Sequence, residues 1–322
     1  MTIVLLSAPL PGGAVDRLRD AGHRVIAGDS PYGLGGEGLI DNLRREPSTE
    51  AMITLLSDRV DRCVLDAGEH LLVVANYAVG VDNLDLEEMK RRRIVATNTP
   101  GVLTDATADL TMALMLDACR NASRGDRLVR RGAWSGWSPM LLLGPRVTGA
   151  TLGIVGLGRI GQAVARRARG FDMRVLYHQR TRASQELEQV LGARYVSLDD
   201  LLGQSDVVSL HCPLTPQTRG LLNGESLAKM KRGAVLVNAG RGPCVDEAAL
   251  AELLSSGHLF AAALDVYERE PEVHPALRGL PNVVLAPHLG SADFATRERM
   301  AEMCADAVLA VLAGKQPPNR VA

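Results

Sequence analysis

The sequence predicts an α/β protein built from two doubly wound domains, each with a parallel sheet. Short strands that are apolar throughout alternate with helical patterns, which is typical of parallel sheets covered on both faces. A glycine-rich turn at residues 156–161 joins a strand to a helix near the middle of the chain. The 322 residues, of which 46% are hydrophobic, provide material for two cores and exclude a disordered chain or a disulfide-stapled miniprotein.

The charge balance and the cysteines narrow the class of protein and its location. Lys plus Arg number 36 and Asp plus Glu number 37, so the net charge of −1 argues against a nucleic-acid partner bound through bulk charge. No stretch approaches ~18 apolar residues, and no basic region precedes the apolar N-terminal run, so we expect neither a membrane span nor a signal peptide. Scattered cysteines without a CxxC pair indicate reduced thiols in the cytoplasm and no zinc site, the five being Cys63, Cys119, Cys212, Cys244 and Cys304.

The first hundred residues contain turns placed where open α/β sheets bind ligands. The turns at 55–58 and 76–82 each follow a strand. Gly80 would let backbone N–H groups approach an anion, although an ordinary turn glycine explains it equally well. We interpret Gly33–Gly38 as a loop, because no strand leads into it. The expected strands are Ile3–Leu6, Arg24–Ala27, Met52–Leu56, Leu71–Ala75 and Ile94–Ala96, and the expected helices are 12–21, 60–68 and 84–93.

The next segment is a helix followed by a long polar excursion. Thr104–Arg120 has helical spacing, with Leu110 and Leu114 along one face. Residues 124–145 then carry both tryptophans, Trp134 and Trp137. An excursion of this length is typical of a lid or an oligomer contact, and we favour the contact.

A dinucleotide-binding turn is the strongest local signal. The strand Thr151–Val155 runs into a GxGxxG string, and a helix over Gln162–Arg169 follows. In that context Gly156 permits the tight turn, Gly158 lets the backbone approach a pyrophosphate, and Gly161 lets helix and strand pack closely. The helix N-terminus then offers N–H groups to the phosphates.

The end of the next strand predicts which dinucleotide binds. A site that prefers NAD usually has an acidic residue about 20 residues beyond the glycines. Here the strand Met173–Tyr177 ends in His-Gln-Arg-Thr-Arg, at residues 178–182, without an acid. Arg180 and Arg182 could pair with a 2′-phosphate, so we predict that NADP(H) is preferred, with NAD(H) as a usable alternative. Two merely solvated arginines are the competing interpretation.

Four further strands are expected at 206–210, 234–238, 261–264 and 283–286. They end at His211, Arg241, Asp265 and His288, and parallel strands bring their ends to one sheet edge. An arginine, a histidine and a carboxylate beside a dinucleotide suit hydride transfer to a small acid, in which Arg binds a carboxylate and His exchanges a proton.

The same residues leave structural alternatives open. Glu270 or Glu268 could orient the imidazole of His288. Arg241 could instead cap a strand end, and His288 could be a buried, hydrogen-bonded histidine. We interpret His211 as structural. No HExxH or GxSxG spacing occurs, so neither a metal nor a serine nucleophile is predicted.

The chain resembles the D-isomer-specific 2-hydroxyacid dehydrogenases, and within them the glyoxylate/hydroxypyruvate reductases. The family resemblance lies in Asn-Ala-Gly-Arg-Gly at 238–242, Leu-Asp-Val-Tyr-Glu-Arg-Glu-Pro at 264–271, Ala-Pro-His-Leu-Gly-Ser-Ala at 286–292, and the segments 211–218 and 230–234. The resemblance to the branch lies in 55–58, 76–83 and 102–109.

The resemblance implies a Rossmann-type cofactor domain over residues 100–290. It also implies a flavodoxin-like, discontinuous substrate domain over residues 1–99 and 291–322, with the active site between the two. Arg241 would hold the substrate carboxylate, His288 would protonate the carbonyl oxygen, and Glu270 would be the partner of His288. The substrate would also meet Leu56, Val79 and Gly80.

The cofactor contacts are predicted along the same edge. Asp265 and Thr104 would lie by the nicotinamide. The complete predicted set is Thr104, Gly156, Gly158, Arg159, Ile160, Gly161, Gln179, Arg180, Thr181, Arg182, Cys212, Pro213, Thr218, Ala239, Gly240, Asp265 and Gly290.

Substrate and assembly follow from the same resemblance. The expected reactions convert glyoxylate to glycolate and hydroxypyruvate to D-glycerate. Another D-2-hydroxyacid dehydrogenase, of the 2-ketogluconate or D-lactate type, is the main alternative, and a corepressor-like NAD(H)-sensing scaffold is the other. A homodimer is implied, with residues 134–145 reaching the neighbouring subunit. The segment 134–142 departs from relatives that have another tryptophan near Met140, so the resemblance leaves the substrate fit from that side open.

Overall fold

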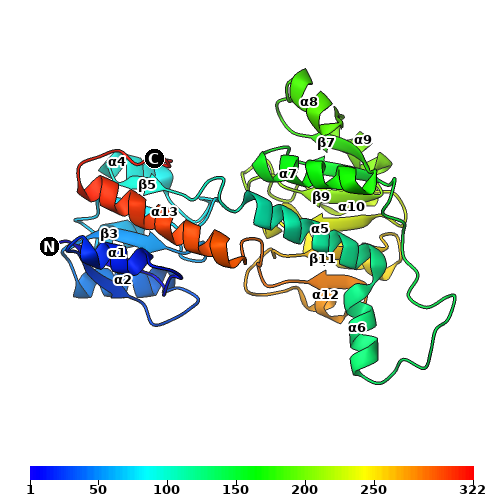
Figure 1. Cartoon of the computed structure of the whole chain (residues 1–322), viewed down its shortest axis with the longest axis horizontal. Coiled ribbons are helices and arrows are strands. Elements are labelled where there is room, and N and C mark those ends of the chain that lie inside the picture. Colours follow the sequence, from blue (N-terminus) through cyan, green and yellow to red (C-terminus); the bar gives the residue numbers. More distant parts are fainter. The chain divides into compact units, whose positions relative to one another are not determined.

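The computed structural model describes all 322 residues, which divide into two compact units. Unit 1 comprises Met1–Leu103 and Ala292–Ala322, and unit 2 comprises Thr104–Ser291. Each unit has one parallel sheet with helices on both faces (Figure 1). The predicted fold class is therefore confirmed. None of the helices combines the length and the hydrophobicity that a membrane crossing requires.

Unit 1 has a five-stranded sheet in the order β2-β1-β3-β4-β5, which is the flavodoxin-like order. Every neighbouring pair is parallel. The strands are β1 (Ile3–Leu6), β2 (Arg24–Ala27), β3 (Thr49–Thr54), β4 (Val73–Asn76) and β5 (Val95–Thr97). The helices are α1 (Ala14–Asp20), α2 (Gly35–Arg45), α3 (Arg62–Ala67), α4 (Leu86–Arg92) and α13 (Phe294–Leu312).

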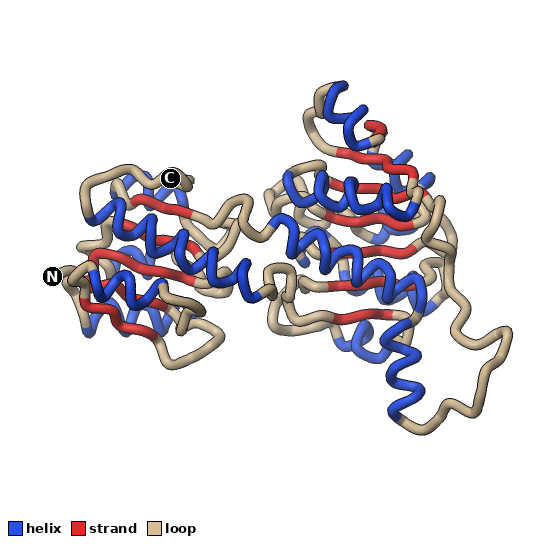
Figure 2. Tube along the Cα trace, viewed as in Figure 1, coloured by secondary structure: helices blue, strands red, loops and turns tan.

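Alternate side chains of the unit 1 strands enter two separate cores. Leu5 and Met52 pack with α2, α3 and α4, whereas Val4 and Ile53 pack with α1 and α13. Successive strand residues point to opposite faces of a sheet, so a strand that is apolar throughout is buried on both faces. The C-terminal α13 thus completes a layer that α1 begins (Figure 2).

The interpretation of Gly33–Gly38 as a loop holds for the first two residues and is wrong from Gly35, where α2 begins. Burial of Leu39 and Leu43, four residues apart, holds this helix against the sheet. The backbone before it is fixed by a hydrogen bond from Gly35 N to Asp58 Oδ1, at 2.8 Å. Tertiary contacts therefore outweigh the low helix propensity of its glycines.

Unit 2 has a seven-stranded sheet in the order β12-β11-β10-β9-β6-β7-β8. Read from β6 outward, this is the doubly wound order of dinucleotide-binding folds, extended by one strand. The strands are β6 (Thr151–Val155), β7 (Arg174–His178), β8 (Ala193–Tyr195), β9 (Val207–Leu210), β10 (Val235–Asn238), β11 (Ala261–Leu264) and β12 (Val283–Leu285).

Helices cover both faces of the unit 2 sheet (Figure 2). On one face α5 and α7 pack against Leu152 and Ile154 of β6, and on the other α9, α10 and α11 pack against Val155 and Leu236. The helices are α5 (Thr104–Arg120), α6 (Ala122–Arg130), α7 (Arg159–Ala168), α8 (Gln185–Leu191), α9 (Leu198–Gln204), α10 (Gly224–Ala228), α11 (Glu247–Ser255) and α12 (Pro275–Gly279), with short 3₁₀ turns η1 (Arg169–Phe171) and η2 (Gly242–Cys244).

The polar excursion begins with α6, none of whose residues is buried, and continues as an extended loop to β6 (Figure 1). Trp134 and Trp137 in this loop are 53% and 83% exposed. The far part of the loop is attached by Asn121, whose Nδ2 donates to Leu142 O at 3.2 Å.

Candidate active site

The carboxyl ends of the unit 2 strands form the candidate site. Because all pairs in this sheet are parallel, the loops after β6, β7, β9, β10, β11 and β12 leave from one edge. These loops carry the predicted glycines, arginines, acids and histidine. Ligands bind at this edge in open α/β sheets.

The glycine turn after β6 fits a dinucleotide. A Cβ at Gly156, where φ is +96°, would lie 2.8 Å from Cys212 N, and a Cβ at Gly161 would lie 2.2 Å from Gly156 O. By contrast, a Cβ at Gly158 would meet nothing within 4 Å. The first and third glycines are therefore required by packing, and the second keeps open space at the N-terminus of α7, which no side chain caps.

Gln179 connects the glycine turn to the loop after β7. Its Oε1 accepts from Leu157 N at 3.0 Å, and its Nε2 donates to Thr181 O at 2.8 Å. The loop at residues 178–182, which is predicted to select between NADP(H) and NAD(H), is thus held at a fixed position beside the glycines.

Arg182 and Arg180 have different surroundings. Arg182 forms a bidentate ion pair with Glu188, with N–O distances of 2.9 and 2.8 Å, and this pairing lowers the pKa of Glu188 to about 2. Glu188 also accepts from the Tyr177 hydroxyl at 2.6 Å. Arg180 and Thr181 are exposed.

The loop after β9 is closed by its own side chains. The Thr218 hydroxyl donates to Pro213 O at 2.7 Å and accepts from Thr215 N at 2.8 Å. Cys212 lies against the glycine turn through its backbone nitrogen.

His211 is half-buried. Its Nε2 lies 2.9 Å from Ser209 Oγ, whereas its buried Nδ1 has no partner. Burial lowers the pKa of His211 to about 4, so the imidazole is neutral near pH 7. His211 is therefore poorly suited to supply a proton.

The turn after β10 presents Arg241. Asn238 builds this turn, because its Oδ1 accepts from Gly240 N at 3.1 Å and its Nδ2 donates to Arg241 O at 3.0 Å. Arg241 Nη1 in turn donates to Gly240 O at 2.9 Å. A Cβ at Gly242 would lie 1.8 Å from Tyr267 O, so only glycine lets this turn pack against the loop after β11.

His288 and Glu270 are in direct contact. His288 Nδ1 lies 2.8 Å from Glu270 Oε2, and both side chains are about a quarter to a third exposed. The second oxygen of Glu270 accepts from Tyr267 N at 3.1 Å. With Nδ1 bonded to the carboxylate, the Nε2 atom of His288 is the nitrogen left to meet a ligand. The side chain of Glu268 is exposed.

Asp265 holds the backbone that carries His288. His288 has φ of +54°, a left-handed conformation that is uncommon outside glycine. Asp265 stabilises it, because Asp265 O accepts from His288 N and its carboxylate accepts from Leu289 N and Gly290 N at 2.6 and 2.8 Å. Burial raises the pKa of Asp265, and these N–H groups and the His288 imidazole oppose the shift.

Other predicted residues occupy less specific positions. Thr104 is the first residue of α5, and Ala239 directly follows β10. In unit 1, Leu56 follows β3 and is 39% exposed. Val79 O and Gly80 O accept from Asn98 Nδ2 and Asn76 Nδ2, both at 2.8 Å.

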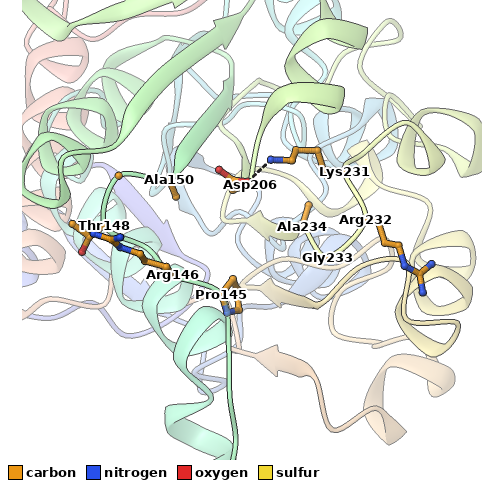
Figure 3. Close-up of a pocket in the computed structure, with 10 residues that line it drawn as sticks. Pro145, Arg146, Thr148, Ala150, Asp206, Lys231, Arg232, Gly233 and Ala234 are labelled. Carbon is orange, nitrogen blue, oxygen red and sulfur yellow. Dashed lines mark hydrogen bonds and ion pairs between the residues drawn. The ribbon is translucent and has the colours of Figure 1, made fainter.

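A separate hollow of about 450 Å³ lies at the amino ends of β6, β9 and β10 (Figure 3). Lys231 and Asp206 pair inside it, and Arg232 points away. Since this is the opposite sheet edge, the hollow is distinct from the candidate site.

Two residues with structural influence on the site had no predicted role. Asn238 lies within the Asn-Ala-Gly-Arg-Gly motif without a predicted contact of its own, and Glu247 lies outside the predicted set. An amide at a strand end is a signal for a side-chain-built turn, whereas an acid opening a helix resembles any favourable first-turn residue.

Comparison with known proteins agrees with this geometry. The sequence model of the D-isomer specific 2-hydroxyacid dehydrogenase NAD-binding domain matches residues 112–290, more than half of the chain. This chain belongs to the D-isomer-specific 2-hydroxyacid dehydrogenases. It is accordingly an NAD(P)-dependent oxidoreductase that uses a nicotinamide cofactor.

Proteins similar to this chain cover nearly its whole length. A glyoxylate reductase from Thermococcus onnurineus is 45% identical over 99% of this chain and 95% of its own length. The structure of the TT0316 protein from Thermus thermophilus superposes with a TM-score of 0.91, 48% identity and full coverage of both chains. An NADPH-dependent glyoxylate/hydroxypyruvate reductase from Sinorhizobium meliloti, in complex with NADP and malonate, has a TM-score of 0.88 and 32% identity over 100% and 97% of the two chains.

The buried neutral state of His211 predicts acid sensitivity in this dehydrogenase. Its pKa of about 4 in the folded chain lies below the ordinary value of 6.5, so between these pH values the unfolded chain binds the extra proton. Stability therefore falls as the pH drops from 6.5 to 4, by up to about 3 kcal/mol from this residue. Urea unfolding at several pH values measures this, and His211→Gln should show a flatter decline than wild type.

The exposed His70 provides the control, since His70→Gln should leave the decline unchanged. A His211→Gln protein that loses stability in parallel with wild type over this range would contradict the assignment.

Proposed function

We propose that this dehydrogenase reduces small 2-oxo acids with NADPH, converting glyoxylate to glycolate and hydroxypyruvate to D-glycerate. The observation that carries the proposal is the 2.8 Å contact between His288 and Glu270 at the sheet edge that also carries the glycine turn and Arg241. The names of the relatives support the substrate class, since glyoxylate reductases recur among them.

The cofactor is proposed to lie along the glycine turn. Gly158 and the N–H groups at the start of α7 would receive the pyrophosphate, and Gln179 to Arg182 would meet the adenosine ribose. When bound, the nicotinamide supplies a hydride for the substrate carbonyl carbon.

Arg241 and His288 are proposed to handle the substrate. The planar guanidinium of Arg241 matches a carboxylate in a bidentate way and fixes the acid against the loop. His288 Nε2 then donates its proton to the carbonyl oxygen, while Glu270 stabilises the imidazolium through Nδ1. Asp265 preserves the backbone conformation that aims the ring.

The two units are proposed to have different binding roles. Unit 2 would bind the cofactor, and unit 1 would contribute Leu56, Val79 and Gly80 to the substrate. The cytoplasmic location that the cysteine pattern predicts remains a prediction.

Kinetics test the catalytic assignment. General acid catalysis is worth roughly 10²–10⁴ in rate, so His288→Ala should lower kcat for glyoxylate with NADPH by about that factor. Arg241→Ala should mainly raise KM for the 2-oxo acid and also lower kcat, because it orients as well as binds. Steady-state assays with glyoxylate, hydroxypyruvate, pyruvate and 2-ketogluconate measure both effects and rank the substrates.

His70→Ala, at an exposed position in unit 1, should leave these constants unchanged. A fully active His288→Ala enzyme would refute the proton role, and a preference for pyruvate or 2-ketogluconate would favour another dehydrogenase type.

The preference for NADPH is assigned to Arg180. Arg182 is engaged by Glu188, whereas Arg180 is exposed in the same loop. No acid occupies the end of β7, so a 2′-phosphate would meet positive charge without a repelling carboxylate.

Arg180→Ser should therefore raise KM for NADPH about tenfold or more and change KM for NADH little, because a charge-assisted contact with phosphate is worth ~1.5–3 kcal/mol. Arg166→Ser, at an exposed position on α7, is the matched control. A wild-type enzyme with a lower KM for NADH than for NADPH would overturn the preference.

A homodimer is proposed to form through the loop that follows α6. Large apolar side chains are exposed there, including Trp137 at 83% and Met140 at 75%, and a second copy of the chain would cover them. Sedimentation equilibrium should give twice the chain mass for wild type and a weaker dimer for Trp137→Ser. A monomeric wild-type protein would contradict this proposal.

A further inference from the structure

We propose that Glu247 is a positioning residue for proton transfer, because its buried carboxylate fixes the loop that carries Glu270. This inference rests on the proposed function, in which the Glu270–His288 pair supplies the proton. Glu247 does not touch the pair and would act only through the backbone between Glu268 and His274.

Glu247 forms two hydrogen bonds that bracket Glu270. Its Oε1 accepts from Glu268 N at 2.7 Å, and its Oε2 accepts from His274 N at 3.1 Å. The residue is only 5% exposed. Each carboxylate oxygen thus holds one end of the segment 268–274, and Glu270 lies between the two attachment points.

The segment has few other attachments on that side. Residues 268–272 are all exposed, and Val273, next to His274, is the partly buried apolar residue of the segment that packs against a core of unit 2. Apolar burial therefore contributes little around Glu270 itself. Within the segment, Glu272 N donates to Arg269 O at 2.8 Å, which closes a local turn but does not connect it to the rest of unit 2. A buried carboxylate bonded to two N–H groups is therefore a main constraint on the position of Glu270.

A second attachment comes from Tyr267. Its N–H donates to Glu270 Oε1, and its hydroxyl donates to Ala286 O at 2.8 Å, next to the end of β12. Tyr267 also packs against Gly242, directly after Arg241. Loosening Glu247 should therefore displace Glu270 relative to His288, while the bond from the Tyr267 hydroxyl to Ala286 O persists.

A double-mutant cycle tests this coupling, with kcat for glyoxylate and NADPH as the readout. E247Q retains the size of the side chain but turns an amide N–H₂ toward one of the two N–H donors. We expect kcat to fall by up to about 10²-fold, with KM for NADPH unchanged. Because Glu247 acts through Glu270, E247Q should add no further loss in the E270Q background.

The matched control is E252Q, at an exposed position on the same helix, which should retain wild-type kcat. An unchanged kcat in E247Q, or losses that multiply in the double variant, would overturn the proposal.

Hydrogen exchange gives a test that does not depend on turnover or on the folding of E247Q. In the wild-type protein, the amides of Glu268 and His274 should exchange slowly despite the exposed side chains around them. In the milder variant E247D, whose shorter side chain cannot span both donors, residues 266–275 should exchange faster while the rest of α11 is unaffected. Fast exchange of both amides in wild type would refute the anchoring role. A wild-type enzyme that reduces no 2-oxo acid would instead contradict the proposed function, and the exchange result would still decide whether Glu247 anchors the loop.

Discussion

The hydrogen bond between Glu270 Oε2 and His288 Nδ1 is the interaction on which the proposed chemistry depends. An imidazole can donate a proton in a fixed direction only if one nitrogen is held and the other faces the substrate. Neighbouring residues hold both partners of this hydrogen bond in place. Asp265 stabilises the left-handed backbone at His288, and Tyr267 holds the second oxygen of Glu270. These supports bond to the backbone or hold Glu270 in place, so they restrict position, and the Asp265 carboxylate also interacts electrostatically with the imidazole.

The parallel sheet explains how residues so far apart in the sequence can share one site. Arg241, Glu270 and His288 follow three neighbouring strands, β10, β11 and β12, and all three strands end at the same edge. The glycine turn after β6 leaves from that edge too. The seven-stranded sheet of unit 2 is thus a rigid frame on which short loops set the chemistry, and the close approach of Gly242 to Tyr267 links the loops to each other.

The sequence predicted those features that have a strict physical requirement. Gly156 and Gly161 are fixed by steric contact, and strands such as Thr151–Val155 are buried on both faces, so each has a clear signature. The helix α2 was not predicted, because its glycines have a low helix propensity. The helix is stable only because Leu39 and Leu43 pack against the sheet. The strand β8 was not predicted, because three residues are too few to show the apolar pattern of a strand. Glu247 could not be recognised, since burial of an acidic helix-opening residue depends on a loop that begins 21 residues further along the chain.

A crystal structure of the complex with NADPH and oxamate, a non-reducible 2-oxo acid analogue, tests the central claim most directly. The account predicts that the analogue carboxylate is bound by Arg241, and that the oxygen standing for the substrate carbonyl lies about 2.6–3.2 Å from His288 Nε2, with Nδ1 still bonded to Glu270. An imidazole that is turned away from the analogue, or separated from Glu270 in the complex, would contradict it.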